Sequence, residues 1–182
     1  MIVIAALSIA ILLRAAAGRE FEGLGRVHLK GEVVLLWTLA VQVAVPALPL
    51  HGASARVVFY VWFCTLPLMA TVAWVNRQRP GMVVLALGLV MNGMVIAANG
   101  GMPVSLDSVS AISSIPLARG LPAGDFVHVA LGPGSPLAVL ADVIPLPGPP
   151  GFASIVSPGD VLLYVGLVAA ISSLRAERPT LA

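Results

Sequence analysis

Apolar residues are gathered in long runs that are separated by short polar segments. The runs at residues 1–17, 33–50, 57–75, 82–98 and 161–174 each meet or approach the roughly twenty residues that a helix needs to cross a bilayer. These runs predict five membrane-spanning helices. The expected fold class is therefore all-α, a polytopic transmembrane helix bundle, within one integral membrane domain that covers residues 1–182.

The first run is the marginal one. It has no basic residue ahead of its apolar core and has Arg14 near its end. This order of charges is the reverse of that in a cleavable signal peptide. We therefore expect residues 1–17 to be a retained span whose amino end lies outside.

Composition agrees with a membrane protein. Hydrophobic residues make up 59% of the chain, and charged residues make up 10%, against roughly 25% in soluble domains. The net charge of +2 comes without a dense basic and aromatic patch, which argues against a nucleic-acid partner. The expected partners are the lipid bilayer and either other membrane proteins or a membrane-anchored peptide substrate.

The basic residues predict the orientation of the spans. Eight of the ten fall in segments on one side of the predicted membrane, and they are Arg14, Arg19, Arg26, Lys30, Arg77, Arg79, Arg175 and Arg178. That side is cytoplasmic by the positive-inside rule. We expect a multi-pass protein of a bacterial cytoplasmic membrane, with its N-terminus outside, its C-terminus cytoplasmic and all four aspartates on the outer side.

Residues 99–158 form a long Pro/Gly-rich external loop that holds ten of the fifteen prolines. Two short interfacial helices are expected within it. One runs from Ser105 to Ser113, with Ser105 as its cap, and one from Ser135 to Ala141, where Pro136 suits the first helical position. Irregular backbone cannot face lipid. The loop should therefore lie in the interface or fold over the mouth of the bundle.

Polar residues at the outer end of the fourth run allow two interpretations. Asn92 and Asn99 are two helical turns apart and share a face, which is typical of helix packing, and Gly100 and Gly101 fit a helix C-terminal cap. Alternatively, these four residues and Arg119 form a polar mouth that receives a substrate or a lipid headgroup.

Three segments carry a family resemblance. The runs LGLVMNGMVIAANGGMPVS, ADVIPLP and SPGDVLLYVGL resemble those of a family of small bacterial polytopic membrane proteins known as a domain of unknown function. The resemblance covers most of the chain. It implies the fold and the location, and it implies no activity.

A second resemblance covers about fifty residues of the C-terminal part. Asp142 precedes an apolar pair, and Asp160 follows eighteen residues later at the start of the last span. This order is similar to that in lipoprotein signal peptidases, which are four-span aspartyl proteases, and it implies that Asp142 and Asp160 are catalytic. The chain departs from that family at MPV after Gly101 and at Ser157, Pro158 and Gly159, which leaves substrate and activity open.

The two aspartates also have structural interpretations. A pair of carboxylates close together can share acid and base roles in hydrolysis. However, SPGD reads as a capping box in which Ser157 and Asp160 bond to each other's amides, and Asp142 can pair with Arg119 or Arg56. A metal site that uses His51, His128 and these aspartates lacks any ligand-spacing motif, and no cofactor is expected.

Three function classes follow from these observations. The first is a structural or interaction (accessory) membrane protein, because no complete catalytic motif is present. The second is an aspartyl peptidase-like hydrolase, and the third is a protein that binds or transports a lipid or small molecule. The separation of Asp142 and Asp160 in space discriminates the second class from the first.

Overall fold

The computed structural model describes residues 29–48, 50–110, 112, 121, 125–148 and 153–173. Every structural statement below refers to these residues. The predicted first span and Arg119 lie outside them.

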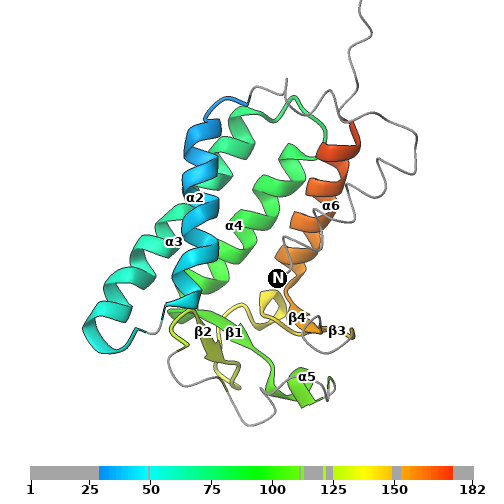
Figure 1. The fold of residues 1–182 in the computed structure, drawn as a ribbon. Helices are drawn as coiled ribbons and strands as arrows, with labels where there is room; N and C mark the ends of the chain where they lie inside the picture. The colour runs from blue at the N-terminus through cyan, green and yellow to red at the C-terminus, as the bar shows by residue number, and fades with distance from the viewer. Residues whose placement is uncertain are drawn as a thin grey trace, which may run out of the picture.

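Helices occupy four of the predicted spans. These four helices pack in a row, with α2 on α3, α3 on α4 and α4 on α6. Successive helices run in alternating directions (Figure 1). Their bounds are α2 Glu32–Ala44, extended by the 3-10 helix η2 Val45–Ala47, α3 Gly52–Val75, α4 Met82–Asn99 and α6 Pro158–Ser173. The predicted predominance of helix is confirmed.

Two of these helices are long and apolar enough to cross a membrane. They are α3 and α4, whose most apolar windows have mean hydropathies of 1.8 and 2.0. The helix formed by α2 and η2 and the helix α6 are apolar but shorter. By length and composition, the described residues therefore contain two candidate spans.

One end of the bundle carries basic residues and is called the basic end here. The Asn76 side chain donates a hydrogen bond to the Lys30 carbonyl (2.9 Å) and accepts one from the Lys30 amide (3.0 Å), which joins the start of α2 to the end of α3. Arg77 and Arg79 lie in the following turn, where Gly81 has the positive φ of 82° that starts α4. The segment NRQRPG therefore forms a tight turn between α3 and α4.

Two pairs of glycines bring α4 and α6 into backbone contact. A Cβ placed on Gly88 would lie 2.6 Å from the Gly159 carbonyl oxygen, and one on Gly166 would lie 2.9 Å from the Gly81 carbonyl oxygen. Within each helix the paired positions are seven residues apart, which is two turns. The helices therefore pack closely along two turns, as in small-residue interfaces of membrane helices.

We expect Gly88→Ala to lower the free energy of unfolding by about 2–3 kcal/mol, because the new methyl group must push α6 away. Gly93→Ala is the matched control, since Gly93 lies in the same helix and a Cβ there meets nothing within 4 Å. Both changes gain the same helix propensity of up to about 1 kcal/mol. Thermal unfolding in detergent measures the difference, and equal melting temperatures would contradict the close packing.

The described residues between 100 and 157 form a cap over the other end of the bundle (Figure 1). In the cap, β1 pairs in parallel with β2, and β3 pairs antiparallel with β4. The elements of the cap are β1 Met102–Val104, α5 Leu106–Ser110, β2 His128–Ala130, η4 Ala138–Leu140, β3 Ile144–Leu146 and β4 Ser154–Val156.

The cap corrects the expected secondary structure of the loop. The predicted helix after Ser105 is present as α5, with the Ser108 amide bonded to the Ser105 hydroxyl (3.2 Å). The predicted helix from Ser135 to Ala141 is a single 3-10 turn, η4. Leu137 has a φ of 54°, which is not a helical conformation, so no helix can run through this position. The short strands were not predicted; their pairing satisfies backbone groups that helices would otherwise satisfy.

The hydrophobic core extends from the helices into the cap. Buried residues of α3 and α4, including Phe59, Trp62 and Val95, form one cluster with Met102 of β1 and Val127. The cap therefore packs on the end of the bundle, and it holds its polar side chains at that junction.

Candidate carboxylate site

Asp160 lies in the first turn of α6 and completes a capping box. The Asp160 amide donates to the Ser157 hydroxyl oxygen (2.9 Å), and the Ser157 amide donates to Asp160 Oδ2 (3.1 Å). Each side chain thus satisfies a backbone donor of the helix start. The predicted capping box is confirmed.

Asn92 of α4 extends this network across the helix pair. Its side-chain amide donates to Asp160 Oδ1 (2.8 Å), and its carbonyl oxygen accepts a hydrogen bond from the Ser157 hydroxyl (2.9 Å). Both oxygens of Asp160 therefore accept hydrogen bonds from N–H donors, which is the pattern of an ionised carboxylate. The network fixes this carboxylate relative to α4.

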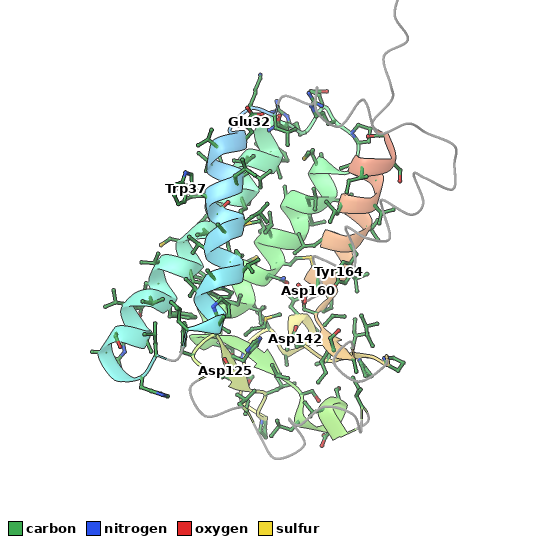
Figure 2. All side chains as sticks on the ribbon, in the orientation of Figure 1. Glu32, Trp37, Asp125, Asp142, Asp160 and Tyr164 are labelled. Carbon is green, nitrogen blue, oxygen red and sulfur yellow. The ribbon has the colours of Figure 1, made fainter. Side chains whose placement is uncertain are left out.

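Asp142 belongs to the cap and lies near the start of α6. Its amide donates to the Pro103 carbonyl and its carbonyl accepts from the Ser105 amide, both at 2.9 Å, so that its backbone lies beside β1. Two residues later the hairpin of β3 and β4 pairs Ile144 with Val156. Asp142 is thereby placed next to the start of α6, as Figure 2 shows.

Asp142 is 7% exposed, and its Oδ1 atom is buried without a hydrogen-bond partner among the described residues. Burial, followed by the negative charge of Asp160, raises the pKa of Asp142 from 3.8 to about 7, although the nearby His128 lowers it. The predicted ion pair of Asp142 with Arg56 is not formed. Asp142 therefore keeps its proton up to about neutral pH.

A histidine and a further aspartate lie beside this pair. The Asp125 Oδ2 atom is 2.8 Å from His128 Nδ1, while Asp125 Oδ1 accepts hydrogen bonds from the Val127 and His128 amides at 3.0 Å. Burial favours the neutral form of Asp125, but its bonds to His128 and Val127 and the histidine charge outweigh this effect and lower its pKa below 3.8. Sequence reasoning missed this pair, although the Asp-x-x-His spacing was the available signal.

Among the described residues of the predicted polar mouth, Asn92 is separated from the consecutive residues Asn99, Gly100 and Gly101. Asn92 is inside the helix pair, whereas the Asn99 side chain donates to the Pro136 carbonyl (2.9 Å) and holds the cap. Gly100 has a φ of 70° and is the C-cap of α4, as predicted. Gly101 has no positive φ, and a Cβ there would lie 2.9 Å from Val129 Cγ1 in β2.

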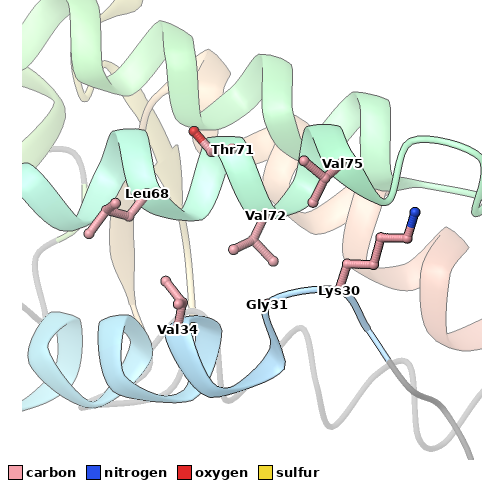
Figure 3. A pocket seen from close by; sticks show the side chains of 7 residues that line it. All are labelled: Lys30, Gly31, Val34, Leu68, Thr71, Val72 and Val75. Atoms are coloured by element: carbon pink, nitrogen blue, oxygen red, sulfur yellow. The ribbon is translucent and has the colours of Figure 1, made fainter.

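Two hollows lie away from the carboxylates. One of about 240 Å³ is at the cap and is lined by Gly52, Ala55, Arg56, Phe59, Gly100 and Phe126. Figure 3 shows the other, of about 370 Å³, between α2 and α3 near the basic end, lined by Lys30, Gly31, Val34, Leu68, Thr71, Val72 and Val75. Lys30 is the one charged residue in this second lining, so its walls suit apolar chains.

No group of three or more His, Cys, Asp and Glu side chains in the described ranges is arranged to hold a metal ion. His51, named as a possible ligand with His128, lies at the start of α3 and makes no side-chain hydrogen bond to cap that helix. The convergent groups of the site are thus carboxylates, one imidazole and one amide.

The fold and this site define a small apolar helix bundle whose cap holds a buried acidic cluster. The chain belongs to a family of unknown function, DUF5317, whose model matches residues 26–172. This finding confirms the predicted resemblance to a domain of unknown function.

A protein of Thermotoga maritima (strain ATCC 43589 / DSM 3109 / JCM 10099 / NBRC 100826 / MSB8), described as uncharacterized, is 33% identical over 92 residues. The match covers 50% of this chain and 51% of that protein, so the chain spans about half the length of this relative. No solved structure matches the chain.

Proposed function

We propose that this protein is a multi-pass protein of a bacterial cytoplasmic membrane, with five spans and the cap on the outer side. Only 28% and 33% of the apolar windows of α3 and α4 are buried, although a core helix of a soluble protein is mostly buried. Large apolar side chains such as Val57 (64% exposed) and Leu87 (52% exposed) face outward. Lys30, Arg77 and Arg79 at the basic end favour a cytoplasmic location for that end.

For its activity, we propose hydrolysis of a peptide bond in a membrane-anchored substrate, with Asp142 as the acid and Asp160 as the base. One observation carries this proposal: the buried Asp142 carboxyl group, which has an unpartnered oxygen, interacts electrostatically with the hydrogen-bonded Asp160 carboxylate. When two carboxyl groups lie in such different environments, one stays protonated while the other is ionised.

The reaction then proceeds in two balanced steps. Asp160 takes a proton from water as the water oxygen bonds to the carbonyl carbon, and Asp142 gives its proton to the carbonyl oxygen. The resulting diol loses its amine as the C–N bond breaks: Asp160 protonates the nitrogen, and Asp142 recovers a proton from a diol hydroxyl. A carboxylic acid and an amine leave, and both carboxyl groups regain their first states.

The similarity to lipoprotein signal peptidases supports the same proposal. In both cases an aspartate followed by an apolar pair precedes a second aspartate at the start of the last span. The proposal extends this similarity to the chemistry, while Ser157, Pro158 and Gly159 before the second aspartate distinguish the substrate contacts of this chain.

The proposal is tested with purified protein in liposomes and a library of membrane-anchored peptides, with cleavage products identified by mass spectrometry. Asp142→Asn should lower the rate at least about 100-fold, because the amide cannot donate the acid proton. Asp107→Asn is the control, since it removes an aspartate charge from α5 at the same end of the molecule. Equal rates for the wild type and Asp142→Asn would contradict the proposal.

A structural or interaction role is the second candidate. The observation in its favour is that Asp160 uses both oxygens to cap α6 and to tie it to Asn92. A wild-type protein that cleaves no peptide in the library, yet co-purifies with a defined membrane partner, would favour this role over hydrolysis.

A further inference from the structure

Titratable side chains from three segments interact at one junction between cap and helices: Asp125 with His128, then Asp142, then Asp160. In the parallel pairing of β1 and β2, His128 lies opposite Met102, while Asp142 lies opposite Val104. Paired residues on neighbouring strands project to the same face, and so do residues two apart in one strand. His128 and Asp142 therefore project from the same face, which is the face that Met102 presents to the core.

Asp125 fixes the imidazole of His128 on this face. Its Oδ2 atom is 2.8 Å from Nδ1 of the ring, and its Oδ1 atom is held by two backbone amides. The Asp125 side chain is 14% exposed and the His128 side chain is 38% exposed. The imidazole is thus anchored by Asp125 and is partly exposed to solvent.

The surrounding charges favour the imidazolium form. Burial opposes protonation of His128, but the hydrogen bond and charge of Asp125, together with the charges of Asp142 and Asp160, outweigh burial and raise its pKa above 6.5. The effect is mutual, because the histidine lowers the pKa of Asp142. From α6, the Tyr164 hydroxyl is the further titratable group that faces these two aspartates.

Cations are scarce around this cluster. Arg56 lies with Phe126 around the hollow at the cap and forms no ion pair with a described residue. Within the described residues, the positive charge that acts on Asp142 is therefore that of His128.

We propose that His128 is a positioning residue of this site: its imidazolium, held by Asp125, stands beside Asp142 and Asp160 and balances their negative charges. The inference rests on the proposed hydrolysis, in which Asp142 must give up and recover its proton in each turnover. Without the histidine charge, burial and Asp160 would raise the pKa of Asp142 further. Asp142 would then be a weaker acid, and the first step, in which it gives its proton to the carbonyl oxygen, would slow.

Infrared difference spectroscopy of the full-length protein in liposomes tests this role without any substrate. The carbonyl stretch of the protonated Asp142 carboxyl group is assigned by its loss in Asp142→Asn, and its titration midpoint is then compared between variants. His128→Gln should raise the midpoint by about one pH unit, a tenfold change in the ratio of protonated to ionised Asp142. His128→Lys should return it toward the wild-type value, because it restores a positive charge.

Two further variants make the result decisive. Asp125→Asn should also raise the midpoint of Asp142, because it removes the carboxylate that raises the pKa of His128 and so lowers the fraction of imidazolium. His51→Gln, at the exposed start of α3, should leave the midpoint unchanged. An equal midpoint in wild type and His128→Gln would overturn the inference. A wild type that cleaves nothing would contradict only the hydrolysis, because the infrared titration does not depend on cleavage.

Discussion

Asp160→Glu should lower the rate of peptide hydrolysis at least about 100-fold while the protein stays folded. Glutamate is the residue commonly found at the third helical position of a capping box, so the hydrogen bond from the Ser157 amide can re-form in the variant. The extra methylene group, however, moves the carboxylate away from the position in which Asn92 holds it and in which it faces Asp142. The variant thus separates a role in capping from a role in catalysis.

The measurements are the cleavage rate and the melting temperature of the same preparation. Asp160→Ala is the comparison, because it removes both hydrogen bonds and should cost about 1–2 kcal/mol of unfolding free energy along with the activity. If Asp160→Glu cleaved at the wild-type rate, the position of the carboxylate would not matter, and capping alone would account for this residue.

Asp142→Asn should change the pH dependence of stability. Because the folded-state pKa of Asp142 is raised from 3.8 to about 7, the folded protein binds this proton more tightly than the unfolded chain does. The resulting stabilisation is fully present below about pH 4 and is lost as pH rises through about 7. The difference between the two pKa values corresponds to a free energy of the order of 4 kcal/mol.

The asparagine variant carries no charge at this position at any pH. Its stability relative to the wild type should therefore increase between about pH 4 and pH 8, with a melting temperature several degrees higher at the upper end. Unfolding followed by tryptophan fluorescence measures the two curves, and the groups that both proteins share cancel in the difference. Glu32→Gln, an exposed carboxylate in α2, is the control, and parallel curves for the wild type and Asp142→Asn would contradict a buried Asp142.

The helices were predictable because their signals are local. Long apolar runs required no knowledge of neighbours, and the sequences NRQRPG and SPGD mark helix ends by the chemistry of their own residues. The start of α6 was predicted within three residues of its observed position at Pro158. The capping box and the role of Gly100 follow from the same local rules.

The cap was not predictable in this way. Each of its strands has three residues, and β1 pairs with a strand twenty-six residues later, Met102 with His128. Such pairing depends on contacts between segments that are distant in the sequence. The residues of these short strands show no alternation of apolar and polar positions that would predict a strand. The Asp142 and Asp160 pair was therefore predicted from a family resemblance. His128 was named only as a possible metal ligand, and its place beside Asp142 was missed because it depends on β1 lying between β2 and Asp142.

The backbone contact between α4 and α6 assigns the two carboxylates to different parts of the molecule. Gly88 and Gly159 leave no side-chain layer between these helices, so Asp160 moves with the bundle. Asp142 is bonded through its backbone to β1 and moves with the cap. A change in the spacing of the acid and the base would therefore require the cap to shift relative to α6, and the packing of Met102 and Val127 on the bundle core opposes such a shift.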